Sequence, residues 1–272
     1  MSENHLLRGH APVSGASWEL IDEEARERLG VALAARRLVD FSGPHGWEHS
    51  ATNLGRTEPI ADAPCDGVVA LRRRVLSLAE LRAPFPIARD ELRAGDRGAE
   101  DVDLEALDRA ARNLAVAENK AVFHGWSHAG IEGITEASPH PEVSRGSQFD
   151  EYPRPVAKAV ELLLQCGVGG PYGLALGTGD YTGVVETAEH GGYPLFDHLR
   201  AILGGPIVWS PGVRGAVVLS QRGGDFLFDS GQDIAVGYDA HDADAVHLYL
   251  EESFSFRVTT PEAAVALVPA GS

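Results

Sequence analysis

The chain has 272 residues, of which 44% are hydrophobic and 23% are charged, as in ordinary globular proteins. This length predicts one large domain or two modest ones with a sizeable core, and the composition excludes a mainly disordered chain. Aspartate and glutamate number 40 against 23 lysines and arginines, so the formal charge is −17. Because so acidic a surface repels phosphate groups, we expect neither nucleic acid nor a membrane surface as a general partner.

The chain contains two cysteines, Cys65 and Cys166. This number excludes a disulfide framework and a Cys-rich zinc site. Residues 1–15 hold no apolar stretch of signal-peptide length, and no apolar run in the sequence is long enough to cross a bilayer. We therefore expect a protein of the cytoplasm.

The first element after the polar residues 1–15 is an amphipathic helix. We expect Ser17 to cap it, and its apolar residues recur at helical spacing from Trp18 to Leu33. The breaker cluster Gly43-Pro44-His45-Gly46 predicts its end. Residues 47–82 then predict two extended limbs around a polar middle. Such an arm has too little apolar surface to be stable alone and must lie on its own domain or on a neighbour.

Residues 81–87 predict an edge strand, because Pro84 and Pro86 have no N–H group to donate to a neighbouring strand. A long helix follows, capped by Asp103 and ended by His124-Gly125, with apolar residues at steps of three and four.

The second half mixes helices and strands and gives an α+β fold. Apolar residues occupy the even positions of 246–258, which predicts a long, half-buried antiparallel strand. Arg222-Gly223-Gly224-Asp225 predicts a hairpin turn between the strands before and after it. The other predicted elements are helices at 155–165 and 195–203 and strands at 172–176, 206–209, 216–220, 226–229 and 232–238.

Two short motifs resemble catalytic or nucleotide-binding patterns, and both have a simpler interpretation. Residues 125–129, which include Ser127 and His128, nearly match a nucleophile elbow but follow a helix instead of a strand. A turn that ends the helix is the favoured interpretation. Residues 177–183 resemble a dinucleotide fingerprint whose third glycine comes one residue late. A turn between a strand and a helix is favoured there.

Clusters of ionisable residues give no metal site. The eleven histidines form no His-Glu-x-x-His pattern and have no cysteine pair near them. Asp239, His241, Asp242 and Asp244 lack the glycine and the distal glutamate of a calcium loop, so we expect a solvated acidic turn. Residues 72–74 are three arginines that we expect to pair with carboxylates of this chain or of a neighbour.

No group of residues predicts an active site, and several surfaces need a partner. A polar N-terminal arm, a long limb that cannot fold alone and a glycine-rich insertion are together typical of a protein that assembles with copies of itself.

Several sequence blocks resemble the encapsulins, the shell proteins of bacterial and archaeal nanocompartments (family 1, linocin-like). The blocks run in order from one end of the chain to the other, and the most specific are residues 43–48 and 220–226. The full set is Ala11-Pro12, 36–40, 43–48, 80–83, 169–172, 193–195, 220–226 and 251–256.

The resemblance implies the Hong Kong 97-like fold of tailed-phage major capsid proteins. Residues 1–46 then form an N-terminal arm and helix, and 47–81 form the extended loop that lies across a neighbouring subunit. The peripheral domain comprises 82–150 and 226–272, and the axial domain comprises 151–225.

The family function is structural and not enzymatic. It implies self-assembly into a closed icosahedral shell, which we expect to be of the smallest class, T=1. The shell encloses a cargo enzyme, a dye-decolourising peroxidase or a ferritin-like protein, for oxidative-stress or iron handling. A short terminal peptide of the cargo docks on the inner wall.

The resemblance also implies the residues of two sites. The peptide-docking surface comprises Leu29, Leu33, Arg36 and Asp40, with Asp233, Ile234 and Val236 opposite. Apolar side chains in such a groove suit an apolar peptide, and Arg36 and Asp40 would orient it. The five-fold pore is lined by Glu189, His190, Gly191, Gly192 and Tyr193.

We expect no cofactor. Some family members hold a flavin with an aromatic residue near the strand that ends at Ile87, and this chain has Arg89-Asp90-Glu91 there.

Two other functions remain as alternatives to a shell protein. A hydrolase using Ser127 or His128 predicts a small oligomer and an activity that is lost on Ser127→Ala. A secreted antibacterial protein predicts activity from the isolated chain without particles.

Overall fold

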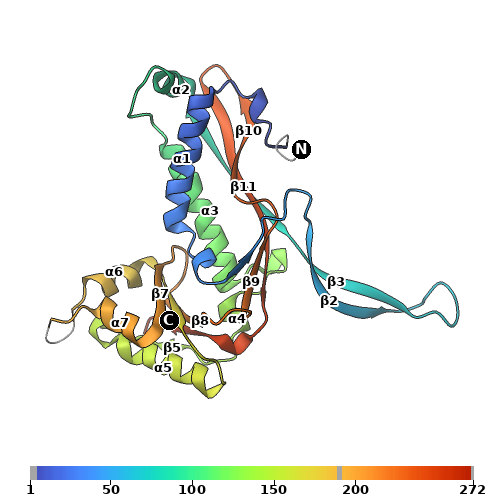
Figure 1. Ribbon diagram of the computed structural model, residues 1–272, viewed down its shortest axis with the longest axis vertical. Coiled ribbons are helices and arrows are strands. Elements are labelled where there is room, and N and C mark those ends of the chain that lie inside the picture. The colour runs from blue at the N-terminus through green and yellow to red at the C-terminus, as the bar shows by residue number, and fades with distance from the viewer. Residues whose placement is uncertain (1–4, 189–191, 271–272) are drawn as a thin grey trace.

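The computed structural model describes residues 5–188 and 192–270. Figure 1 shows an elongated molecule with an upper part, a lower part and a two-stranded arm that projects from between them. The helices are α1 (Gly15–Ala32), α2 (Arg89–Asp96), α3 (Glu105–His124), α4 (Ile134–Ala137), α5 (Pro153–Gln165), α6 (Thr178–Glu186) and α7 (Leu195–Leu203).

A five-stranded sheet forms the upper part. Its order is β1-β9-β11-β10, and β4 pairs with the other side of β11. Helices α1 and α3 pack beside it, and apolar residues of both helices share one core with the sheet. The strands are β1 (Asp40–Ser42), β4 (Ala79–Ala88), β9 (Phe226–Ser230), β10 (Ala235–His241) and β11 (Ala245–Val258).

Strand β11 is the longest, and it is buried on both faces between Leu248 and Phe256. The prediction of a half-buried strand was therefore wrong. Its even-numbered apolar residues are buried in the two cores: Val246, Leu248 and Leu250 lie in the core shared with α1 and α3, and Phe254 and Phe256 in the other. The opposite face is covered as well, since the Ser255 hydroxyl lies 2.7 Å from that of Thr52 at the base of the arm and the carboxylate of Glu251 lies 3.4 Å from the N-terminal residue His5.

Both predicted ends of α1 were wrong. Ser14 caps the helix, and its hydroxyl accepts a hydrogen bond from the Ser17 N–H at 3.0 Å. The helix ends at Ala32, well before the breaker cluster, because the side chain of Asn119 on α3 hydrogen-bonds to the backbone groups that would otherwise continue the helix. Its amide donates to the Ala32 carbonyl at 2.9 Å and its oxygen accepts from Ala34 and Ala35 at 3.1 and 3.0 Å. The chain therefore turns into a short 3-10 helix (Ala35–Arg37) and then β1.

The predicted long helix is confirmed as α3. It begins at Glu105, where the Asp103 carboxylate accepts a hydrogen bond from the Glu105 N–H at 3.0 Å. It ends at His124, and Gly125 follows with a positive φ, as the sequence indicates.

A second five-stranded sheet, with order β5-β12-β8-β6-β7, forms the lower part. Helices α5, α6 and α7 lie around it (Figure 1). The predicted strands at 172–176 and 216–220 and the helix at 195–203 are confirmed, and the short strands β5 and β12 were not predicted. The strands are β5 (Val143–Ser144), β6 (Tyr172–Leu176), β7 (Gly204–Trp209), β8 (Ala216–Ser220) and β12 (Ala264–Val268).

The strands of the lower sheet do not all come from one of the expected domains. β5 and β12 lie in the ranges expected for the peripheral domain, yet both belong to the lower sheet with β6, β7 and β8. The division into peripheral and axial domains therefore stays a prediction, and the chain crosses between the two sheets several times.

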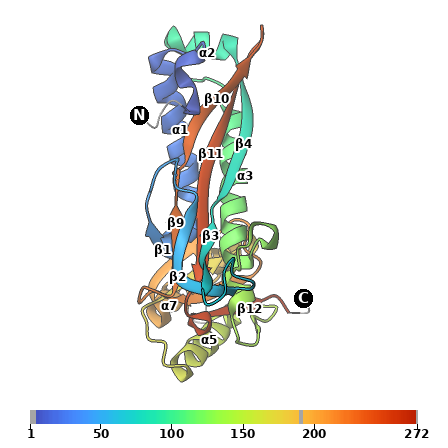
Figure 2. The same cartoon turned by 90° about the vertical axis from the view of Figure 1, so that its right-hand side faces the viewer.

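The arm is the hairpin of β2 (Ala51–Ile60) and β3 (Ala70–Ser77). Two extended limbs were predicted in this region, and the prediction is confirmed. Figure 2 shows the arm beneath the long strands of the upper part, and Figure 1 shows it pointing away from both sheets.

Residues 220–226 join the two sheets. The predicted hairpin is wrong, because β8 pairs within the lower sheet and β9 within the upper one. Gly223 and Gly224 both adopt positive φ angles, of 85° and 82°, which explains the glycine pair. The turn is still tight, but it redirects the chain from one sheet to the other.

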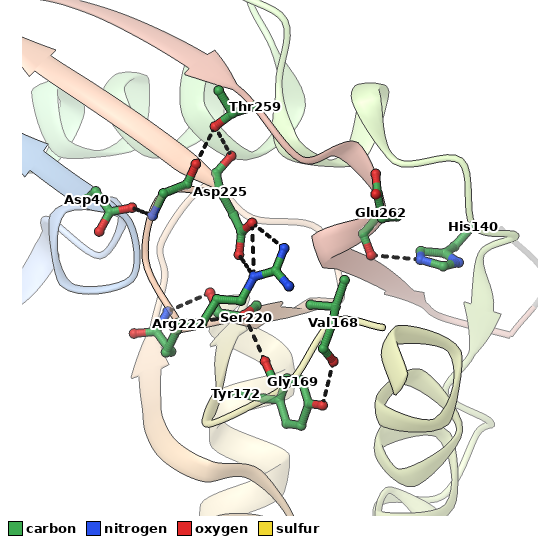
Figure 3. A network of polar contacts seen from close by, with 12 residues as sticks. Asp40, His140, Val168, Gly169, Tyr172, Ser220, Arg222, Asp225, Thr259 and Glu262 are labelled. Carbon is green, nitrogen blue, oxygen red and sulfur yellow. Dashed lines mark hydrogen bonds and ion pairs between the residues drawn. The ribbon is translucent and has the colours of Figure 1, made fainter. Parts of the chain in front are cut away.

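A polar network holds this junction together (Figure 3). The carboxylate of Asp225 is buried and accepts hydrogen bonds from the Arg222 guanidinium at 2.8–3.2 Å. The backbone carbonyl of Asp225 accepts from the Thr259 hydroxyl at 2.9 Å. The Ser220 hydroxyl donates to the Gly169 carbonyl at 3.1 Å. These contacts tie the turn to both sheets and to the loop before β6.

Candidate functional site

A groove of about 450 Å³ opens between α1 and β10 in the upper part. Its apolar surface comes from both elements: Leu29 and Val236 are buried, and Leu33 and Ile234 are half-buried on the walls. The groove is lined by Arg8, Asp22, Ala25, Arg26, Leu29, Gly30, Leu33, Arg36, Asp233, Ile234, Ala235, Val236 and Leu250.

The N-terminal residues form one rim of this groove. The Arg8 guanidinium donates to both carboxylate oxygens of Asp22 on α1, at 2.7 and 3.2 Å, and lies 4.1 Å from the centre of the Trp18 ring. A two-point ion pair of this kind fixes the rim more firmly than a single contact does. The segment before α1 is therefore part of the site.

Arg36 forms one end of the groove, where three carboxylates surround its guanidinium. It donates to Glu118 on α3 at 2.6 Å, to Glu252 on β11 at 2.7 Å and to Asp233 before β10. The side chains of Glu118 and Glu252 are essentially fully buried, whereas that of Asp233 is 44% exposed. Arg36 is thus held within the chain, and the carboxylate of Asp233 is the member of the cluster that is exposed at the groove.

Burial and the neighbouring charges both shift the pKa values of the residues in this cluster. Burial raises the pKa of Glu252 well above its usual 4.5, and repulsion from the neighbouring Glu118 adds to this effect. Burial likewise raises the pKa of Glu118, although Arg36 opposes the change. For Arg36 itself, burial acts to lower the pKa, but the attraction of Glu118 and Glu252 outweighs it, so the guanidinium stays charged.

Asp40 does not lie at the groove, so the structure brings together only six of the seven residues expected there. Asp40 begins β1, which pairs with β9, and its carboxylate accepts a hydrogen bond from the Gly224 N–H at 2.6 Å (Figure 3). The early end of α1 explains the difference. A helix continued to residue 40 would keep Asp40 near Arg36, whereas the turn at residues 33–39 carries it to the junction between the sheets.

Several residues of the groove and of the Arg36 cluster were not predicted from the sequence. Arg8 and Asp22 meet only because the N-terminal segment folds back onto α1. Glu118 and Glu252 come from elements far apart in the chain, and the one available signal was that Glu252 interrupts the apolar row of β11.

The expected pore loop is only partly described. Glu189, His190 and Gly191 lie outside the described residues. Gly192 has a positive φ, and Tyr193 is 52% exposed with its ring 6.3 Å from that of His198 on α7.

The remaining motifs have structural roles. Ser127 and His128 are exposed on a short 3-10 turn after α3. Gly177 links β6 to α6 as a turn between strand and helix. Arg89, Asp90 and Glu91 form the first turn of α2, and the absence of a flavin stays a prediction.

The acidic turn before β11 is exposed, as expected. The carboxylate of Asp242 accepts hydrogen bonds from the His247 ring and from two backbone N–H groups, and these contacts lower its pKa. Among the residues that the structure describes, no three His, Cys, Asp or Glu side chains are placed to hold a metal ion. The same described part of the chain has no helix long and apolar enough to cross a membrane.

The arrangement of a long-stranded sheet, a long helix, a second sheet and a projecting arm is that of a capsid protein. It matches a virus-like particle protein from Pyrococcus furiosus with a TM-score of 0.66 and 18% identity, over 92% of this chain and 98% of the other. The capsid of an empty GTA particle matches with a TM-score of 0.53 and 15% identity, over 88% and 90% of the two chains. The predicted Hong Kong 97-like capsid fold is confirmed.

Sequence comparison identifies the family. The Linocin_M18 family model, described as an encapsulating protein for peroxidase, matches residues 3–255. The type 1 encapsulin shell protein of Rhodospirillum rubrum is 47% identical, over 97% of this chain and 96% of the relative. That of Mycobacterium tuberculosis is 42% identical, over 97% and 99%. The chain belongs to the type 1 encapsulin shell proteins, a family of structural proteins and not of enzymes.

Proposed function

We propose that this chain assembles with copies of itself into a closed icosahedral shell of the smallest class, T=1, in the cytoplasm. Family membership and the capsid fold support the assembly. So does the arm, because an isolated two-stranded hairpin is at best marginally stable in water and this one leaves Val69 and Leu71 84% and 54% exposed.

The shell encloses a cargo enzyme whose short terminal peptide binds in the groove between α1 and β10. One observation carries this part of the proposal: six residues expected from the family resemblance, distant in sequence, line one groove. They are Leu29, Leu33, Arg36, Asp233, Ile234 and Val236.

The groove favours an extended peptide with apolar side chains. Leu33 and Ile234 are half-buried without a peptide, so an apolar side chain placed between them removes further apolar surface from water. The half-exposed carboxylate of Asp233 and the Arg8–Asp22 pair offer polar contacts at the two rims. A basic residue of the peptide therefore fits beside Asp233.

A dye-decolourising peroxidase is the favoured cargo and a ferritin-like protein the second candidate, with a role in oxidative-stress or iron handling. The description of the matching family model, which names a peroxidase, supports the first. Small solutes would pass through a five-fold pore lined by residues 189–193, and the acidic chain would favour cations if its carboxylates also line the pore.

Neither alternative function has support of this kind. A hydrolase needs a nucleophile and a base held together in a shaped site, whereas Ser127 and His128 are exposed neighbours on a surface turn. For a secreted antibacterial protein, no feature of residues 5–188 and 192–270 favours activity of a single chain over assembly.

Negative-stain electron microscopy of the purified chain tests the shell. Uniform hollow spheres are expected. A small discrete oligomer, or a stable monomer, contradicts the proposal.

The docking site is tested by Leu33→Asp, with Val31→Asp as the matched control. Both residues lie at the carboxyl end of α1, but Val31 is 62% exposed and lies outside the groove. A charge at residue 33 places a desolvated carboxylate against the apolar peptide, so co-expressed peroxidase should fail to co-purify while spheres still form. Val31→Asp should retain the cargo. If the peroxidase still co-purifies with Leu33→Asp spheres, the docking site lies elsewhere.

A further inference from the structure

His124, the last residue of α3, is hydrogen-bonded at both of its ring nitrogens. Its Nε2 lies 3.0 Å from the backbone nitrogen of Arg214, in the loop between β7 and β8, and its Nδ1 lies 3.1 Å from the Thr135 hydroxyl on α4. A backbone N–H group can only donate, so Nε2 is the acceptor and carries no proton. The proton of the neutral ring is then on Nδ1 and is donated to the hydroxyl, which itself donates to the Phe123 carbonyl at 2.8 Å. These contacts together require a neutral histidine.

The surroundings of this ring also favour its neutral form. Burial lowers the pKa of His124 below its ordinary 6.5, and the neighbouring cations Arg214 and Lys120 lower it further. Glu136 on α4 acts in the opposite direction without reversing the shift. Because the pKa is depressed in the folded chain, the stabilisation from this contact is complete above about pH 6.5 and is lost as pH falls below that value.

The loop between β7 and β8 lies along α3 and is held there by side chains of that helix. Before His124 along the helix, the Asn119 amide donates to the Pro211 carbonyl at 3.0 Å. Gly212 passes so close to α3 that a β-carbon there would lie 3.0 Å from the Val116 carbonyl oxygen. The amide of Asn119 does not titrate, so of these contacts the one made by His124 is the one that depends on pH.

Helix α3 belongs to both parts of the molecule, as Figure 1 shows. Leu107 and Leu114 lie in the core of the upper part, whereas Val122 and Phe123 lie in the other core, together with strands of the lower sheet. At the end of this helix, His124 connects it to a loop of the lower sheet. A titratable residue therefore lies in one of the connections between the two parts.

We infer that His124, Thr135 and Arg214 form an acid-sensitive clasp, in which the neutral ring holds the β7–β8 loop on α3 and protonation of the ring releases it. A proton on Nε2 removes the acceptor of the Arg214 N–H group and places two donors face to face. Release gives His124 back the ordinary pKa of 6.5. Acid therefore favours the released loop by about tenfold for each pH unit below that value, until the ring is protonated in the closed form as well.

Hydrogen–deuterium exchange of the Arg214 amide tests the clasp, because this amide is protected while it is bonded to His124. The purified chain is labelled at about pH 8 and about pH 5, the peptides are analysed by mass spectrometry, and the rates are corrected for the intrinsic effect of pH. Exchange at Arg214 should be up to about 30-fold faster at the lower pH. The Ser210 amide of the same loop is the internal control. It donates to the Leu176 carbonyl at 2.7 Å and should keep its corrected rate.

Two glutamine variants separate His124 from other effects of acid. In His124→Gln the amide oxygen can accept from the Arg214 N–H group and does not titrate, so the acceleration should disappear. His128→Gln is the matched control, because His128 is exposed on the turn after α3, and it should behave like the original chain. Equal corrected exchange of the Arg214 amide at both pH values in the original chain, or the same acceleration in His124→Gln, overturns the clasp. If His124→Gln does not fold, the original chain and its Ser210 control still decide the question.

The clasp does not rest on the proposed function, but it has a consequence for the shell, where it would be present in every copy. Light scattering during acidification tests this consequence. Particles of His124→Gln should dissociate at a lower pH than those of the original chain, and particles of His128→Gln at the same pH as the original. Dissociation of all three at one pH contradicts the consequence for the shell and leaves the clasp standing. If the original chain forms no particles at neutral pH, the proposed function itself fails.

Discussion

The cluster around Arg36 and the arm both contain arginines, but the two regions differ in how far these arginines are buried and paired. Arg36 is 15% exposed and bound by carboxylates from three separate parts of the chain. Arg72 on the arm is 68% exposed and has one loose contact, 3.3 Å from Glu58. The Arg36 cluster therefore pairs its cation within one chain, whereas the arm leaves charged and apolar groups exposed. Mutations in the Arg36 cluster should therefore reduce the stability of the folded chain, whereas mutations in the arm should mainly reduce assembly.

Arg36→Met should have the largest effect on folding. It leaves Glu118 and Glu252 buried without their cation, and breaking a buried ion pair in this way costs about 3–5 kcal/mol. Urea denaturation followed by tryptophan fluorescence measures the loss. Arg37→Met is the control, because Arg37 is exposed beside it and its replacement should change the free energy of unfolding by less than about 0.5 kcal/mol. Equal midpoints for the two variants would show that the cluster contributes little to stability.

Glu252→Gln should change how stability depends on pH. Because the pKa of Glu252 is raised above 4.5 in the folded chain, its contribution is fully present when the residue is protonated in both states and is lost as pH rises through the raised value. Glutamine stays neutral and still accepts from Arg36. The variant should therefore lose less stability than the original chain as pH rises above about 5, by about 1.4 kcal/mol for each unit by which the pKa is raised.

Thermal unfolding of both chains at a series of pH values from about 5 upward makes the comparison. The groups that face Glu252 are Arg36 and Glu118, with Asp233 on the far side of the guanidinium. Of these, Glu118 is also buried with a raised pKa, so some pH dependence should remain in the variant. Parallel curves for the two chains would mean that Glu252 does not take up a proton on folding.

The sequence predicted regular elements well wherever a local pattern specifies them. The periodicity of α3, the short apolar run of β6 and the polar limbs of the arm all appear where expected. In the groove, the apolar residues of α1 and β10 were also expected. These predictions rely on spacing along one element, or on a family resemblance that spans the chain.

The features that the sequence analysis placed wrongly or missed share a different cause. Asn119 ends α1 from the side of α3, and the turn at Gly223-Gly224 joins strands of two sheets. Glu118 and Glu252 are buried beside Arg36 from distant elements. Each of these features depends on a contact between residues far apart in the chain, and a single sequence contains no local signal for it. Asp40 was misplaced for the same reason, since its position depends on where α1 ends.

Arg72→Ala should have the smallest effect on folding and so gives the sharpest contrast with Arg36→Met. Exposed ion pairs contribute little because water and salt screen them, and the pair with Glu58 is exposed on both sides. The free energy of unfolding of the dissociated chain should change by less than about 0.5 kcal/mol. Assembly should still weaken, because β3 loses one of the three arginines that we expect to pair with carboxylates of a neighbouring copy, and particles should dissociate at a lower salt concentration than before. Light scattering against salt concentration measures this effect. A large loss of folding stability, or particles unchanged in their response to salt, would contradict the division between a self-sufficient body and an arm that depends on its neighbour.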